Sequence, residues 1–275
     1  MIGLGSYAYF WRASSRVAEP MSLIDQLVDA RQLGIGLFQI CDYAPLSRYR
    51  PGQMRDVRRA ADDLGIRLQL GTKGIAPGRL RQFLTFAELL EARLVRSMIL
   101  LGEDQPALEE SESVLRGILP AFERQGVTLA LETYEQVPTA MLVELVERVA
   151  SPNLGICLDP ANMVAALEHP NDVIEACAPH TVNVHVKDFA FTRRGGWVGF
   201  TLDGAPLGTG LLDYHRLATV VRPDERGIDQ IIEHWLPWLD DAADGAHEGA
   251  DTTVRTEREW TLAALAALHG STEKT

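Results

Sequence analysis

Short apolar runs recur along the chain and alternate with segments that have helical spacing. The runs cover residues 2–7, 35–41, 66–71, 94–100, 127–132, 154–159, 182–187 and 229–233. Their starts lie about 27 to 33 residues apart, except for the last interval of about 47. The segments 22–34 and 54–65 place apolar residues at a period of 3.6 and end in glycine. Glycine readily adopts the left-handed backbone conformation that commonly ends an α-helix. Eight strands alternating with helices predict an α/β fold, a (β/α)8 TIM barrel.

An open doubly wound sheet is the alternative fold for the same alternation of strands and helices. It would require a glycine-rich phosphate turn of the form GxGxxG after the first strand, and the segment GLGSYAYF does not have that spacing. The length of 275 residues suits a single barrel, which commonly needs about 250 residues. We therefore expect one domain spanning residues 1–275.

Composition and charge narrow the function classes. The chain is 46% hydrophobic and 23% charged, as expected of a globular protein with a sizeable core. Its formal net charge of −12 opposes a nucleic-acid partner, which would need clustered lysines and arginines. There is no membrane-length apolar stretch, and we expect no targeting signal. The odd, widely spaced Cys41, Cys157 and Cys177 indicate reduced core thiols, so we expect a cytoplasmic protein.

Four acidic or imidazole side chains stand at the ends of the later runs. Glu132 closes VTLALE, Asp159 closes LGICLD, His185 lies in VNVHVKD, and Glu233 ends IIE. Because side chains alternate along a strand, the first three share a face with small or polar residues, and the leucine, isoleucine and valine side chains point to the opposite face. They are therefore expected to point into the barrel near the carboxyl ends of the strands, where barrel enzymes carry their chemistry.

This set of side chains predicts a bound divalent metal ion. Singly, each carboxylate could be a helix N-cap and the histidine a satisfied core residue. Together, three carboxylates in one barrel mouth would repel each other unless a cation or a proton were bound. An oxygen-rich set with one imidazole favours Mn²⁺ or Mg²⁺, with Co²⁺ or Zn²⁺ tolerated.

The order ALE, GICLD, VHVKD and IIEHW resembles the xylose isomerase-like TIM barrels, the sugar phosphate isomerase/epimerase superfamily. The resemblance covers essentially the whole chain. It implies that Glu132, Asp159, His185 and Glu233 hold the metal, and that Glu132 and Glu233 are also the catalytic acid/base pair. The activity it implies is a metal-dependent isomerase or epimerase that acts on a small keto-sugar or sugar acid through a metal-stabilised enediolate.

Two positions depart from the ketose 3-epimerase pattern. Asn162 stands where those enzymes usually have a histidine, and Phe191 stands where they commonly have an arginine. Asparagine can form hydrogen bonds but cannot carry a proton. A lyase on the same scaffold, either a decarboxylase of a 3-oxo sugar acid or a dehydratase, is therefore the alternative. A DNA-repair endonuclease would need more metal ligands and a basic surface, and a binding-only barrel is the third class.

The remaining predictions concern substrate contacts and loops. Lys73, Asn162 and Lys187 are expected to bind a small-molecule carbohydrate substrate. Lys73 could instead form a surface salt bridge, and Lys187 could pair either with Asp188 or with a metal ligand. Tyr7, Trp11, Gln39 and Asp42 could line the pocket. The glycine-rich segment 189–213 suggests a hairpin lid or an oligomer contact, and we expect a homo-oligomer. In the acidic segment 240–251, His247 is expected to be a surface residue.

Overall fold

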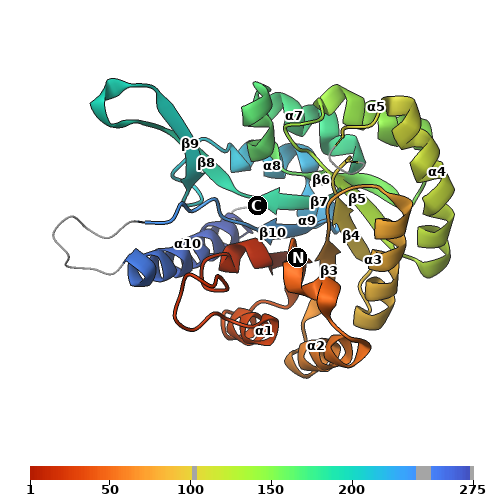
Figure 1. Cartoon of the computed structure of the whole chain (residues 1–275). Coiled ribbons are helices and arrows are strands. Elements are labelled where there is room, and N and C mark those ends of the chain that lie inside the picture. The colour runs from red at the N-terminus through yellow and green to blue at the C-terminus, as the bar shows by residue number, and fades with distance from the viewer. Residues whose placement is uncertain (101–103, 240–248, 273–275) are drawn as a thin grey trace.

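The computed structural model describes residues 1–100, 104–239 and 249–272. Eight parallel strands close into a barrel in the order β1-β10-β7-β6-β5-β4-β3-β2, with helices around it (Figure 1). The strands are β1 (Ile2–Gly5), β2 (Leu37–Cys41), β3 (Arg67–Gly71), β4 (Leu94–Ser97), β5 (Thr128–Glu132), β6 (Leu154–Leu158), β7 (Thr181–Val186) and β10 (Asp229–Ile232). Because β1 pairs with both β2 and β10, the predicted barrel is confirmed and the open sheet is excluded.

The two segments with helical spacing, 22–34 and 54–65, correspond to the first two long helices, although the second begins at Pro51, before the predicted start. The helices are α1 (Leu23–Gln32), α2 (Pro51–Leu64), α3 (Pro77–Leu90), α4 (Leu108–Gln125), α5 (Thr139–Val149), α6 (Pro160–Met163), α7 (Pro170–Cys177), α8 (Tyr214–Val221), α9 (Pro223–Arg226) and α10 (Gly249–Thr272). Ser22 and Asp25 form a capping box at the start of α1. Gly65 ends α2 in the left-handed conformation, which glycine adopts without steric penalty.

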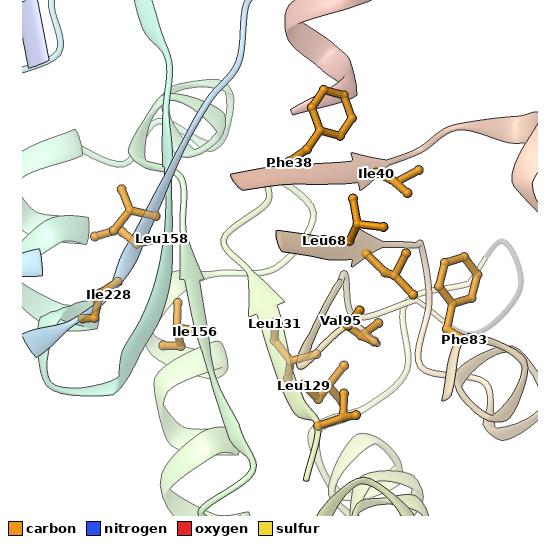
Figure 2. Close-up of a cluster of buried hydrophobic side chains, with 14 of the residues drawn as sticks. Phe38, Ile40, Leu68, Phe83, Val95, Leu129, Leu131, Ile156, Leu158 and Ile228 are labelled. Atoms are coloured by element: carbon orange, nitrogen blue, oxygen red, sulfur yellow. The ribbon is translucent and has the colours of Figure 1, made fainter. Parts of the chain in front are cut away.

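The core lies between the strands and the helices. Leu129 and Leu131 of β5 pack there together with Ile156 and Leu158 of β6, and all four are buried (Figure 2). The alternate residues of the same strands therefore face the barrel axis. This is the side-chain phase that the sequence predicted.

The structure bears on the predictions of reduced core cysteines and of a chain without a membrane-spanning stretch. Cys41, Cys157 and Cys177 are all buried and free of disulfides. Within the described ranges, no helix combines the length and the apolar character needed to cross a membrane.

The long segment after β7 forms an antiparallel hairpin of β8 (Asp188–Arg193) and β9 (Phe200–Ala205). The hairpin extends away from the barrel, beyond the helices (Figure 1). Its base is held by Asp188, whose carboxylate accepts four backbone N–H groups at 2.8–2.9 Å, from residues 189, 208, 210 and 212. A side chain at Gly210 would meet this carboxylate at 2.3 Å, so only glycine allows the approach.

Replacing Asp188 with asparagine should lower the free energy of unfolding by about 2–3 kcal/mol, because an amide nitrogen would face two N–H donors in a buried position. Urea denaturation measures this loss. The matched control is Asp213→Asn, because Asp213 accepts one N–H from Arg216 at the start of α8 and asparagine caps helices equally well. Equal stability losses in the two variants would contradict the anchoring role of Asp188.

His234, which follows β10, makes the stability of the fold depend on pH. It is buried against Thr261 of α10, with its Nε2 3.1 Å from the hydroxyl. Burial, helped by the nearby Arg12 charge, lowers the His234 pKa from 6.5 to about 3. Below pH 6.5 the unfolded chain therefore binds a proton at this histidine, whereas the folded chain does not bind one until the pH approaches 3. The free energy of unfolding falls as the pH falls from 6.5 towards 3.

From this group we expect a loss of about 2 kcal/mol between pH 7.5 and pH 5. Urea denaturation at the two pH values measures it, with His234→Gln as the comparison. The pH-dependent loss should be smaller by that amount in the variant. An identical loss in both proteins would refute the assignment.

Candidate metal and substrate site

Four buried side chains converge at the carboxyl end of the barrel. Glu132 ends β5, Asp159 follows β6, His185 lies in β7 and Glu233 follows β10. Each is 3% exposed or less. The Nδ1 atom of His185 lies 3.3 Å from Glu132 Oε1, 3.5 Å from Glu233 Oε2 and 3.8 Å from Asp159 Oδ2. The structure thus brings together all four predicted ligands.

The chemistry of this cluster fits a cation. His185 Nδ1 and Glu233 Oε1 are buried without a hydrogen-bond partner among the described residues. One ligand atom each from Glu132, Asp159 and His185 lies within 4.8 Å of the others. Glu233 is outside that set of three, although its Oε2 faces the same His185 nitrogen. Three carboxylates and one imidazole could hold a divalent ion.

The cluster is electrostatically strained as a set of free side chains. Burial raises the pKa of Asp159, and the neighbouring carboxylates raise it further. Burial alone would lower the pKa of His185, but Cys157, Glu233 and Glu132 together raise it well above its usual value. The site therefore draws positive charge to Nδ1. A divalent cation would supply that charge without a proton.

Lys187 is a buried cation in direct contact with this cluster. Its Nζ lies 2.6 Å from Asp159 Oδ2 and 3.5 Å from Glu233 Oε2, and it donates to Asn162 Oδ1 at 3.3 Å. Burial opposes its charge, but the carboxylates outweigh that effect and raise its pKa above the usual value. Of the two partners considered for Lys187, the structure places it against the ligand cluster, because Asp188 instead anchors the hairpin.

A cavity of about 170 Å³ opens above the cluster, and all three predicted substrate-binding residues line it. Lys187 and Asn162 are buried at its floor, and the amide of Asn162 donates to Glu132 Oε1 at 3.0 Å. Lys73 is at the rim, 52% exposed and 3.6 Å from Asp42 Oδ2. A surface ion pair of that kind contributes little stability, so Lys73 remains available to a ligand.

The residues suggested for the pocket wall divide into two groups. Tyr7 and Asp42 line the cavity. Gln39 and Trp11 do not: Gln39 lies beneath the site and contacts His185 Nε2 at 2.8 Å, and Trp11 packs on Trp238 with ring centroids 5.1 Å apart. Both were placed too close to the substrate: Gln39 has the inward phase but lies in the middle of β2, and Trp11 lies in the turn beyond β1, where strand phase does not set its direction.

Sequence reasoning missed Arg96 of β4, which is only 4% exposed and lines the cavity. Its Nε forms a very short ion pair with Glu132 Oε2, and its Nη1 donates to Thr72 O at 3.0 Å and faces Asp42 Oδ2 at 3.5 Å. A signal was present, because this arginine is the single charge in the run LVRSMIL and has the inward phase. Trp235 was also missed; its ring lies 4.3 Å from Lys187 Nζ.

The predicted lid does not cover the site in this structure. No residue of the β8–β9 hairpin lines the cavity. Phe191 is 53% exposed and lies instead beside an outer groove near the start of α7. His247, predicted to be a surface residue, lies outside the residues that the structure describes.

Comparisons with known proteins agree with this architecture. The sequence profile of the family described as xylose isomerase-like TIM barrel matches residues 27–260. A 3-oxo-isoapionate decarboxylase of Pectobacterium atrosepticum is 48% identical over 268 residues, which cover 98% of this chain and 94% of the relative.

Solved structures share the fold at lower identity. A xylose isomerase domain protein from Planctomyces limnophilus has a TM-score of 0.68 at 19% identity, covering 98% of this chain and 94% of its own. A xylose isomerase-like TIM barrel protein from Mycobacterium smegmatis, solved in complex with magnesium, has a TM-score of 0.66 at 16% identity, covering 95% and 96%.

Proposed function

The chain belongs to the xylose isomerase-like TIM barrel family, and from that premise we propose that it is a metal-dependent decarboxylase of a 3-oxo sugar acid. The observation that carries the proposal is the 48% identity to a 3-oxo-isoapionate decarboxylase across 98% of this chain. The comparisons therefore favour the lyase alternative over the isomerase or epimerase that the sequence analysis placed first. The substrate class is a small branched or linear sugar acid in which one carbon atom separates the ketone carbon from the carboxylate carbon.

The surroundings of Glu132 also support a lyase over an epimerase. Epimerisation needs one group to remove a proton and another to deliver one on the opposite face. Both Glu132 oxygens are occupied, because Oε2 faces the Arg96 guanidinium and Oε1 accepts from Asn162. Burial would raise the Glu132 pKa, but Arg96, with His185 and Lys187, lowers it below the usual value. A carboxylate held in this way is a poor proton carrier.

Decarboxylation requires less of the protein. The bond between the carboxylate carbon and its neighbour breaks, its electron pair moves into the adjacent carbonyl, and CO₂ leaves. One proton is then added to the carbon that lost the carboxylate. We assign that delivery to Glu233, which lines the cavity and has the unpartnered Oε1. Glu132 then holds the metal without transferring protons.

The residues that we assign to the metal are Glu132, Asp159, His185 and Glu233. The unpartnered Nδ1 of His185 and Oε1 of Glu233, together with the carboxylates of Glu132 and Asp159, fit Mn²⁺ or Mg²⁺, and magnesium is bound by the family structure from Mycobacterium smegmatis. A bound divalent ion would stabilise the negative charge that develops on the carbonyl oxygen.

Cations around the cavity orient an anionic substrate. Lys187 stands at the floor, Arg96 at one wall and Lys73 at the rim. Trp235 adds an apolar surface beside Lys187. A charged carboxylate positioned away from water is favoured to leave as neutral CO₂.

The proposal is tested by measuring CO₂ release from a panel of 3-oxo aldonates, with and without added Mn²⁺ or Mg²⁺. One equivalent of CO₂ should be released per 3-oxo acid consumed, and a chelator should abolish release until the metal is restored. Interconversion of ketoses with no CO₂ from any 3-oxo acid would support the isomerase instead.

A further inference from the structure

We propose that Gln39 is a positioning residue that fixes which nitrogen of His185 faces the ligand cluster. Gln39 is in β2, on the opposite side of the barrel axis from the strand pair β6–β7, and none of its atoms lines the cavity. The inference rests on the proposed function only in assuming that the cluster binds a divalent ion. It concerns metal affinity, which can be measured without turnover.

A chain of buried polar side chains runs through the barrel interior below the site. Its members are Gln39, Gln69, Asn183 and Asp229, all 8% exposed or less. Barrel interiors are usually filled by bulky branched side chains, and a buried amide is unfavourable unless it is hydrogen-bonded. The three amides here satisfy each other and end on the metal-ligand candidate His185. Such a network does more than fill the barrel, because it fixes the orientation of each amide in it.

The direction of every hydrogen bond follows from the carboxylate at the lower end. Asp229 is paired with Arg67, with Oδ1 2.7 Å from Nη2, so its oxygens accept. The Gln69 amide nitrogen donates to Asp229 Oδ2 at 2.7 Å. This leaves Gln69 Oε1 as an acceptor facing upward. A carboxylate held by an arginine cannot donate, so the order is not reversible.

The hydrogen bonds of Gln39 continue the same donor-to-acceptor order as far as His185. The Gln39 amide nitrogen donates to Gln69 Oε1 at 3.0 Å and to Asn183 Oδ1 at 3.2 Å. Both amide hydrogens are therefore used, and Gln39 Oε1 is turned to His185 Nε2 at 2.8 Å. An oxygen there can only accept, so Nε2 carries the hydrogen. Nδ1 is therefore the nitrogen that faces the three carboxylates, and its lone pair is the one available to a bound cation.

A flipped Gln39 would have the opposite effect. Its NH₂ group would face Nε2, the hydrogen of a neutral His185 would move to Nδ1, and the nitrogen that could bind a metal would be blocked. The Asp229–Gln69 pair prevents that flip, because it would bring the Gln39 oxygen against Gln69 Oε1. Gln39 therefore acts on metal binding only through His185.

The test uses Mn²⁺ titration of the full chain by isothermal calorimetry, with Gln39→Met as the main variant. Methionine removes the acceptor but keeps the volume, and Mn²⁺ affinity should fall about 10–100-fold. The matched control is Gln26→Met. Gln26 of α1 is fully buried, and neither of its amide atoms has a hydrogen-bond partner among the described residues, so this variant should bind Mn²⁺ as the wild type does.

A second variant separates positioning from a general effect on folding. Gln39→Glu keeps an oxygen acceptor for His185 Nε2 but cannot donate to Gln69 and Asn183. The Gln39→Glu variant should have a lower melting temperature than the wild type but a similar Mn²⁺ affinity. In ¹⁵N spectra of the Mg²⁺-loaded protein, the His185 hydrogen should be on Nε2 in the wild type.

Three results would overturn the inference. They are a Gln39→Met affinity within twofold of the wild type, an equal loss of affinity in Gln39→Glu and Gln39→Met, or a hydrogen on Nδ1 in the loaded wild type. A wild-type protein that binds no divalent ion would instead contradict the metal assignment in the proposed function. A protein that binds Mn²⁺ as described but releases no CO₂ would leave the role of Gln39 intact.

Discussion

Replacing Glu233 with glutamine is expected to lower turnover of a 3-oxo sugar acid by about 10²–10⁴-fold while leaving the fold intact. The amide can neither deliver a proton nor supply an anionic ligand. The fold should tolerate the change, because Glu233 Oε1 has no partner among the described residues and Oε2 has only long contacts of 3.5 Å to His185 and Lys187. Lys187 would keep its short ion pair with Asp159.

Steady-state kinetics at saturating Mn²⁺, together with the melting temperature, measure these two expectations. Glu147→Gln provides the matched control, because Glu147 is a surface residue of α5 that contacts only His180 in the described structure. If Glu233→Gln kept turnover within tenfold of the wild type, Glu233 could not be the proton carrier.

Replacing Arg96 with methionine should have the largest effect on stability. Removing one partner of a buried ion pair leaves an uncompensated charge, which costs about 3–5 kcal/mol. Glu132 would lose the cation that lowers its pKa. Its pKa should rise, and the acid limb of the rate against pH should move to higher pH. A bound divalent ion would compensate part of the lost positive charge.

Melting temperatures of Arg96→Met with and without Mn²⁺ test this account. The stabilisation by metal should exceed that of the wild type. The exposed Arg59 of α2, which has one long contact of 3.7 Å to Asp56, offers the control Arg59→Met, for which we expect a change within about 0.5 kcal/mol. An acid limb that does not move in Arg96→Met would show that this arginine does not control Glu132.

The fold could be predicted because its signals are local. Each barrel strand is a short apolar run, and α1 and α2 are marked by 3.6-residue spacing and by the caps Ser22 and Gly65. The four proposed ligands were found for the same reason. A carboxylate or imidazole at the end of an apolar run has a direction set by strand alternation and a height set by its place in the run.

The missing parts of the site depend on contacts between distant strands. Arg96 has the correct phase, but its role depends on contacts with Glu132 of β5 and with Asp42, which follows β2, and the spacing along one strand does not predict such contacts. Gln39 was assigned to the pocket wall from its inward phase, although its place in the middle of β2 puts it below the carboxyl ends of the strands. The hairpin was expected to be either a lid or an oligomer contact; four backbone hydrogen bonds to Asp188 hold its base, and it extends away from the barrel.

The central claim is that this site breaks a carbon–carbon bond without rearranging the sugar. The most direct test runs the Mn²⁺-activated reaction in D₂O with a 3-oxo sugar acid labelled with ¹³C at the carboxylate. The metal is then removed and the products are analysed by NMR spectroscopy. We predict one equivalent of labelled CO₂ or bicarbonate and one deuterium at the carbon that lost the carboxylate. Deuterium incorporated with the labelled carboxylate still attached would contradict the claim and identify an isomerase or epimerase.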